Sequence, residues 1–192
     1  MKPVIIAGSK LKHFTDDDLF LRLVLEIGCG VAVTPDAKGL FPEYHEYYMG
    51  NYWAGVSSPN VQEIVESSDL VICVGVVFSD FNTVGWTALI PTEKTIHIDC
   101  YSTNLFGRHY PNTNLIDVLP AIRVTTKKTS SLVNFHRYSA QSGSQRTNDI
   151  IPTDESLTMS FIEGSLQNEL TSKSSVVVET GDSWLVTVYI FI

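Results

Sequence analysis

Basic residues are scarce in this sequence. Its 192 residues include 13 Lys and Arg against 21 Asp and Glu, which gives a formal net charge of -8 at pH 7. Nucleic acids and anionic membranes present phosphate groups that call for clustered positive charge. The acidic composition therefore predicts that neither of them is a partner of this protein.

Cysteine and long apolar runs are also rare. The three cysteines, Cys29, Cys73 and Cys100, are an odd number and form no CxxC pair, so neither a disulfide framework nor a zinc site is suggested. We expect a reducing, cytoplasmic setting. The first residues offer too short an apolar run for a signal peptide, and no stretch approaches the roughly 20 apolar residues that span a bilayer. With 44% hydrophobic and 18% charged residues, the composition is that of a globular protein.

Apolar runs and segments of helical period alternate along residues 1–124. This alternation is typical of a parallel sheet covered by helices. Strands are expected at Pro3–Ala7, Val31–Thr34, Asp69–Gly75 and Thr95–Asp99, and helices at about 15–27, 58–66 and 115–122, with Thr15 and Ser58 as N-caps of the first two. The pattern predicts a doubly wound α/β domain with helices on both faces of its parallel sheet, and a long loop at 35–57.

The composition changes after this domain. Residues 125–148 contain no Asp or Glu and are rich in Ser, Thr and Gln, so 125–150 is expected to be a poorly ordered linker, or alternatively a basic binding arm. Beyond it, Leu157–Leu170 has the period of an amphipathic helix and Ser175–Glu179 reads as a strand. Residues 151–192 are therefore expected to be the truncated start of a second α/β unit.

Several short motifs have a structural explanation as well as a functional one. Gly28-Cys29-Gly30 lies between an expected helix and an expected strand, which is the reverse of the order in a dinucleotide-binding turn, so a tight turn is favoured. Cys29 and Cys73 adjoin apolar strands, where buried and unreactive thiols are common. Gly181-Asp182-Ser183 offers only one carboxylate for a magnesium diphosphate.

The remaining candidates for acid–base chemistry lie mostly in the long loop. Asp36, Glu43, His45 and Glu46 occur close together there, either as an acid–base site or, as we favour, as a solvated loop at a domain interface. The other four histidines are dispersed, and no Ser-His-Asp or Cys-His arrangement can be proposed from them. The residues themselves therefore indicate a fold without indicating a reaction.

Longer segments resemble a known family. Residues 34–43 (TPDAKGLFPE), 50–58 (GNYWAGVSS), 63–69 (EIVESSD) and 78–86 (FSDFNTVGW) are similar to segments of the thiamine diphosphate-dependent 2-oxo acid decarboxylases, pyruvate decarboxylase above all. A further match, Glu179–Trp184 (ETGDSW), follows in the same order. Together these motifs identify the chain as a member of that family.

The resemblance implies three α/β domains in the complete enzyme, of which residues 1–124 look like the middle one and 151–192 like the opening of the last. It implies a decarboxylation of a 2-oxo acid such as pyruvate to an aldehyde and CO2, with thiamine diphosphate and Mg²⁺, in a homo-oligomer. Thr180 and Asp182 match the segment that meets the cofactor. No catalytic residue or metal ligand of the family falls within this sequence, and residues 8–12 lack the regulatory cysteine that some members carry.

Two expectations and one alternative follow. The chain is expected to be inactive alone, as a fragment of the enzyme. Residues 185–192 (LVTVYIFI) depart from the family pattern. The exposed strand edge of the unfinished last domain, together with this apolar octapeptide, is expected to favour aggregation or pairing with another chain. The alternative is a nucleotide-binding, regulatory or interaction module built on the same central domain.

Overall fold

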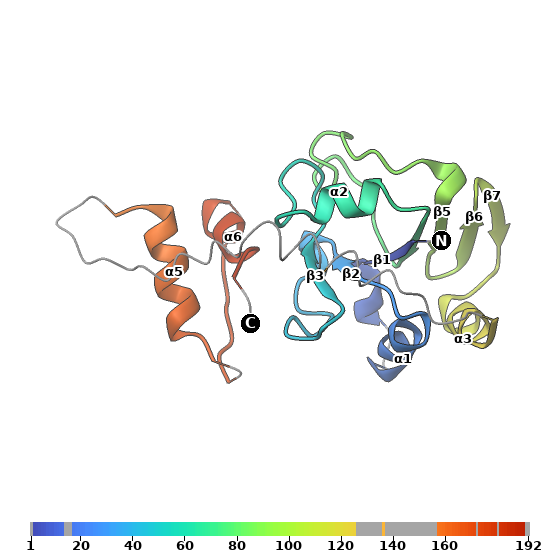
Figure 1. Ribbon diagram of the computed structural model, residues 1–192, viewed down its shortest axis with the longest axis horizontal. Coiled ribbons are helices and arrows are strands. Elements are labelled where there is room, and N and C mark those ends of the chain that lie inside the picture. The colour runs from blue at the N-terminus through green and yellow to red at the C-terminus, as the bar shows by residue number, and fades with distance from the viewer. Residues whose placement is uncertain are drawn as a thin grey trace.

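The computed structural model describes residues 2–13, 17–125, 136, 157–171, 173–179 and 181–190. A seven-stranded sheet in the order β3-β2-β1-β4-β5-β6-β7 forms its centre (Figure 1). The strands are β1 Pro3–Ala7, β2 Val31–Val33, β3 Tyr48–Asn51, β4 Leu70–Val74, β5 Thr95–Ile98, β6 Ser102–Leu105 and β7 Arg108–Pro111. The pairs from β3 through β5 are parallel, and β5-β6 and β6-β7 are antiparallel. The sheet is thus the expected α/β sheet with an added antiparallel edge.

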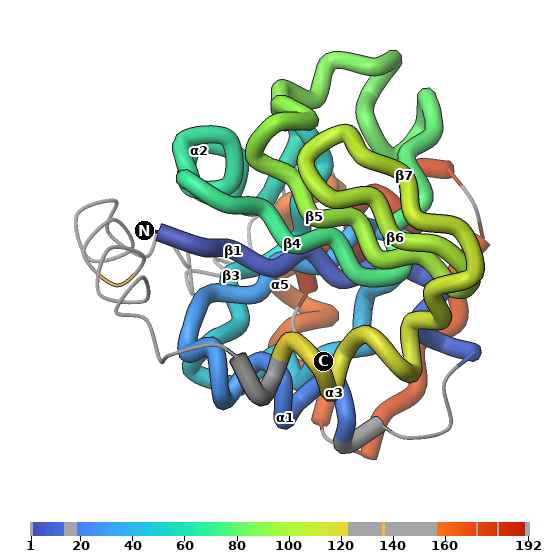
Figure 2. The backbone as a smooth tube through the Cα atoms, turned by 90° about the vertical axis from the view of Figure 1, so that its right-hand side faces the viewer, coloured from blue at the N-terminus to red at the C-terminus, as the bar shows by residue number. Residues whose placement is uncertain are grey.

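Helices cover both faces of this sheet. They are α1 Asp17–Ile27, α2 Val61–Glu66 and α3 Leu115–Thr125, with short 3-10 turns η1 Ser9–His13, η2 Pro35–Ala37 and η3 Thr92–Lys94. Figure 2 shows α1 and α3 together below the sheet, while α2 lies on the opposite side. The predicted doubly wound arrangement is confirmed. The expected N-cap Thr15 lies outside the described residues, and the helix expected from Ser58 begins later, with Asn60 in a left-handed conformation as its N-cap.

Alternate residues of the central strands belong to two separate apolar clusters. In β1, Ile5 faces α1 and α3 together with Leu23 and Leu119, whereas Ile6 faces α2 together with Val65. All five residues of β1 are buried. This is the pattern of a parallel strand covered on both sides, which explains why the sequence shows a continuous apolar run there.

Three strands were not predicted from the sequence. Strand β3 lies within the expected long loop. It was not predicted because Gly50 and Asn51 are residue types that are rare in strands, and because its pairing depends on β2. Its Gly50 has a φ of +119°, and a Cβ there would lie 2.6 Å from the Cβ of Ser58. The β6-β7 hairpin turns through Phe106 and Gly107, both at positive φ. Such a turn usually carries Asn-Gly or Asp-Gly, so Phe-Gly gave no hairpin signal.

The C-terminal region differs from the expected second α/β unit. Helix α5, Met159–Glu169, confirms the predicted helix, and Thr158 caps it by accepting a hydrogen bond from the Phe161 amide. The strand predicted at Ser175–Glu179 is wrong, since these residues have no regular secondary structure. No neighbouring strand from the described residues pairs with them, and without a partner an apolar run has no ladder to join.

The apolar tail also folds differently from the expectation. Residues Asp182–Thr187 form helix α6, and the side chains of Val186, Val188 and Ile190 are buried. Residues 185–190 therefore do not present an exposed strand edge. The expected linker at 125–150 falls almost wholly outside the described residues.

Candidate functional site

The two residues predicted to contact the cofactor are placed unequally. Thr180 lies outside the described residues. Asp182 is the first residue of α6 and is exposed to solvent. Glu179 is the nearest acidic residue in the sequence. Its Oε2 lies 3.8 Å from the position that a Cβ on Gly181 would occupy. The carboxylate of Asp182 is thus free to face a ligand, but this part of the chain does not enclose it.

The residues of the chain do not fit a magnesium diphosphate site by themselves. Mg²⁺ is held by several oxygen ligands in a near-octahedral arrangement. Among the described residues no group of three His, Cys, Asp or Glu side chains lies close enough together to hold a metal ion. A cofactor held through Mg²⁺ would therefore need ligands in addition to those described here.

The carboxyl ends of β1 and β4 form the crevice where open α/β sheets usually bind ligands, because the connections diverge there. In this protein the backbone that follows β1 packs closely against the backbone that follows β4. A Cβ on Gly8 would lie 2.2 Å from the Cα of Val76 and 2.3 Å from the carbonyl oxygen of Gly75. The Lys10 ammonium is held 2.7 Å from both carboxylate oxygens of Asp99. This packing weighs against a phosphate cradle after β1, and so against the nucleotide-binding alternative.

The cysteines next to the apolar strands are buried, as favoured from the sequence. Cys29 and Cys73 are fully buried, and burial raises the pKa of each thiol to about 12. A thiol with so high a pKa supplies almost no thiolate at neutral pH. The structure therefore gives neither of them the environment of a nucleophile.

Two of the four candidate residues in the loop at 35–57, Glu43 and His45, make contacts within the central domain. The carboxylate of Glu43 accepts hydrogen bonds of 2.8 and 3.0 Å from the Lys38 ammonium. His45 Nδ1 accepts a hydrogen bond from the Tyr47 amide, and its ring packs edge-on against Phe41. Glu46 is exposed. Glu43 is buried, so the expected solvated loop does not describe its position, and one carboxylate oxygen of Asp36 is buried without a hydrogen-bond partner among the described residues. No hydrogen bond joins two of these four residues in the part of the chain that the structure describes.

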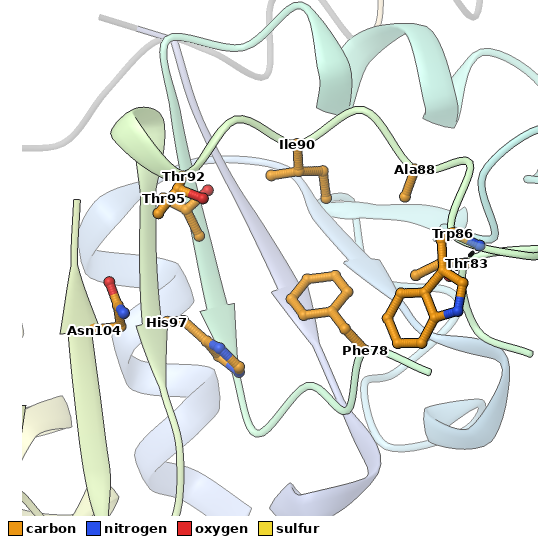
Figure 3. A pocket seen from close by; sticks show the side chains of 9 residues that line it. All are labelled: Phe78, Thr83, Trp86, Ala88, Ile90, Thr92, Thr95, His97 and Asn104. Atoms are coloured by element: carbon orange, nitrogen blue, oxygen red, sulfur yellow. Dashed lines mark hydrogen bonds between the residues drawn. The ribbon is translucent and has the colours of Figure 1, made fainter. Parts of the chain in front are cut away.

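A cavity of about 290 Å³ lies on the α2 face of the sheet, beside β5 and β6 (Figure 3). It is lined by Phe78, Thr83, Trp86, Ala88, Ile90, Thr92, Thr95, His97 and Asn104. His97 is the one ionisable residue in this lining. Its Nε2 lies 3.0 Å from the carbonyl oxygen of Val76, and its ring packs edge-on against Phe78 at a centroid distance of 5.5 Å. Among the described residues no hydrogen bond joins His97 to a threonine hydroxyl of this lining, so the cavity shows no nucleophile paired with a base.

Three residues that contact the C-terminal segment were not predicted from the sequence to have a role. Lys38, Asn51 and Trp53 all contact the C-terminal segment 184–190. They lie within the segments that carry the family resemblance, and no other feature of the sequence pointed to them. Their contacts join residues far apart in the chain, which no local pattern reveals.

Comparison with known proteins gives a consistent result. Residues 1–125 match the family model described as "Thiamine pyrophosphate enzyme, central domain". The chain is 33% identical over 187 residues to a probable pyruvate decarboxylase of Schizosaccharomyces pombe, and 33% identical over 185 residues to a pyruvate decarboxylase of Neurospora crassa. It is 34% identical over 186 residues to pyruvate decarboxylase 2 of Arabidopsis thaliana.

These matches cover the two proteins unequally. They include 95–96% of this chain but 30–32% of the three relatives, so the chain spans about a third of the length of the curated relatives it matches. Across the described residues, every helix is too short or too polar to span a membrane.

Proposed function

The chain belongs to the thiamine pyrophosphate enzymes, and we propose that it supplies the central domain of a decarboxylase of the pyruvate decarboxylase type. The reaction of the whole enzyme would convert a 2-oxo acid such as pyruvate to an aldehyde and CO2, with thiamine diphosphate and Mg²⁺. The observation that carries this proposal is the family match over residues 1–125 together with similarity to pyruvate decarboxylases along nearly the whole chain.

The chain itself is proposed to be catalytically silent. When bound, thiamine diphosphate supplies the nucleophilic carbon and the electron sink that decarboxylation needs. The family resemblance assigns the activating glutamate and the proton-transferring histidines to another domain, and the Gly-Asp-Gly…Asn metal motif to a segment that this sequence does not match. Of the cofactor-contacting segment, the described residues provide only exposed Asp182, with Thr180 as the second candidate. This supports a role in architecture rather than in the chemical step.

The setting proposed for the enzyme follows from the same membership. We infer a cytoplasmic location and a homo-oligomeric assembly, because the acidic composition and the unpaired cysteines agree with the first and the family resemblance implies the second. Neither nucleic acid nor a membrane is proposed as a partner.

The test is a comparison of the purified chain with an intact pyruvate decarboxylase. Aldehyde release from pyruvate is followed with thiamine diphosphate and Mg²⁺ present, and cofactor binding is measured by calorimetry. We expect turnover and binding in the intact enzyme only, with no saturable binding by this chain at micromolar cofactor, which corresponds to about -8 kcal/mol of affinity. Aldehyde formation or tight Mg²⁺-dependent binding by the chain alone would overturn the proposal of a silent domain.

A further inference from the structure

The C-terminal segment 184–190 is anchored to the central sheet through its main chain. The Asn51 side-chain amide donates a 2.6 Å hydrogen bond to the carbonyl oxygen of Val188, and the Lys38 ammonium donates a 2.5 Å hydrogen bond to that of Ile190. In return, the Tyr189 hydroxyl donates to the carbonyl oxygen of Val56 at 2.6 Å. Lys38 follows the 3-10 turn η2 after β2, and Asn51 is the last residue of β3, so this end of the sheet binds carbonyl groups of alternate residues.

Both donors are held in place by the central domain. Lys38 is fixed by its ion pair with Glu43, whose side chain is only 2% exposed. The backbone amide of Asn51 donates to the Ser58 hydroxyl, and Asn51 as a whole is 2% exposed. Among the described residues, Val188 is the acceptor for the Asn51 side-chain NH2. Donors fixed in advance lose little conformational freedom when they bind, which favours specific docking.

An aromatic cluster completes the contact. The Trp184 ring packs against Trp53 and Phe81, with centroid distances of 5.5 and 5.2 Å. Trp53 is held by a 2.6 Å hydrogen bond from its indole NH to the carbonyl oxygen of Phe81. Buried Val186, Val188 and Ile190 extend this apolar contact along the segment. Aromatic pairs contribute beyond the area that they bury, and fixed rings lose little entropy.

We propose that Lys38, Asn51, Trp53 and Phe81 form a docking site whose occupant is the chain's own segment 184–190. The site recognises an apolar segment by two main-chain carbonyl groups and one indole ring. Docking also fixes the start of α6, and with it Asp182, relative to the central domain. The docking itself does not depend on the proposed decarboxylation, so the two proposals can fail separately.

Hydrogen exchange of the full chain tests the docking. The amides of Leu185, Val188 and Ile190 donate to the carbonyl groups of Gly181, Trp184 and Thr187, all within residues 181–190. A helix as short as α6 is unstable in isolation, so protection of these amides reports docking. We expect Asn51→Leu to accelerate exchange in 185–190 about tenfold, because it leaves the Val188 carbonyl unpaired. Glu46→Gln, an exposed change in the same loop, is the matched control and should leave exchange unchanged. Amides of β1 and β4 report whether the domain is still folded.

A change on the segment side removes any dependence on the folding of the domain. Trp184→Ala leaves the central sheet intact and should also accelerate exchange of 185–190 about tenfold. Unprotected amides in the unaltered chain, or rates that neither variant changes, would overturn the docking site. Protection that disappears on dilution, together with a dimer in light scattering, would overturn the chain's own segment as occupant and indicate a second copy.

Discussion

The central domain and the C-terminal region are stabilised in different ways. In residues 2–125, strands such as β1 are buried on both faces, and two apolar clusters lie on opposite sides of the sheet. Helix α5 has no buried residue, and its Phe161 and Leu166 remain exposed. In Figure 1, α5 lies well away from the sheet. The C-terminal region is attached to the central domain through α6 and the residues that follow it.

This difference shows what an apolar pattern alone can establish. The period of Leu157–Leu170 was sufficient to predict a helix, but a helix of this length gains most of its stability from packing, and none of the residues of α5 is buried. The central domain therefore carries the fold, and the C-terminal region depends on a few specific contacts. Matched substitutions in the two regions measure how far this contrast extends.

The largest expected effect comes from truncating equivalent leucines in the two regions. Leu23 in α1 is fully buried, so Leu23→Ala should lower the free energy of unfolding by about 3 kcal/mol. Leu166→Ala in half-exposed α5 should change it by less than about 0.5 kcal/mol. Urea denaturation followed by circular dichroism checks both variants. Equal losses would show that α5 belongs to the cooperative unit of the central domain.

A second effect concerns close packing inside the central domain. Gly8→Ala should destabilise it by about 2 kcal/mol, because the added Cβ meets the backbone of Gly75 and Val76 and these atoms cannot give way as a side chain would. Gly55→Ala is the control, since a Cβ there meets nothing within 4 Å. Denaturation midpoints of the two variants give the comparison. If Gly8→Ala were as mild as the control, the crevice between β1 and β4 would be open enough for a ligand.

The parts of the fold predicted from the sequence are those whose signal is local. Continuous apolar runs predicted β1 and β4, because both faces of these strands are buried. Helical spacing predicted α1 and α3, because one face of each helix packs on the sheet. Strand β3 escaped prediction because its place depends on β2 and on the close approach of Gly50 to Ser58. The predicted strand at Ser175–Glu179 shows the converse, since strand propensity without a partner strand does not form a sheet.

The candidate site was harder to predict for a related reason. Asp182 was named through family resemblance, and the structure adds only that it is exposed at the start of α6. The contact of Lys38 with Ile190 joins residues 152 positions apart, so no spacing rule points to it. Lys38 and Asn51 act through geometry that exists only after folding, and this is why the sequence marked their segments without assigning their contacts.

The smallest effect tests whether charge pairing adds to the contrast between the two regions. Lys10 and Asp99 form an ion pair that joins the turn after β1 to the end of β5, within the central domain. Burial opposes ionisation of the Asp99 carboxyl, but the hydrogen bonds from Lys10 and the Cys100 amide, with the charge of Lys10, outweigh it and lower its pKa. A carboxyl with a lowered folded-state pKa stabilises the fold above its unfolded-state pKa, and this contribution is lost as the pH falls through the folded-state value.

Both side chains are about one-third exposed, so solvent screens the pair and Asp99→Asn should cost less than about 1 kcal/mol at pH 7. The difference between the variant and the unaltered chain should shrink below about pH 4 and vanish at lower pH. Urea denaturation between pH 3 and 7 measures it, with exposed Glu93→Gln as the control. A difference that does not depend on pH would show that Asp99 acts through its contacts with the backbone rather than through its charge.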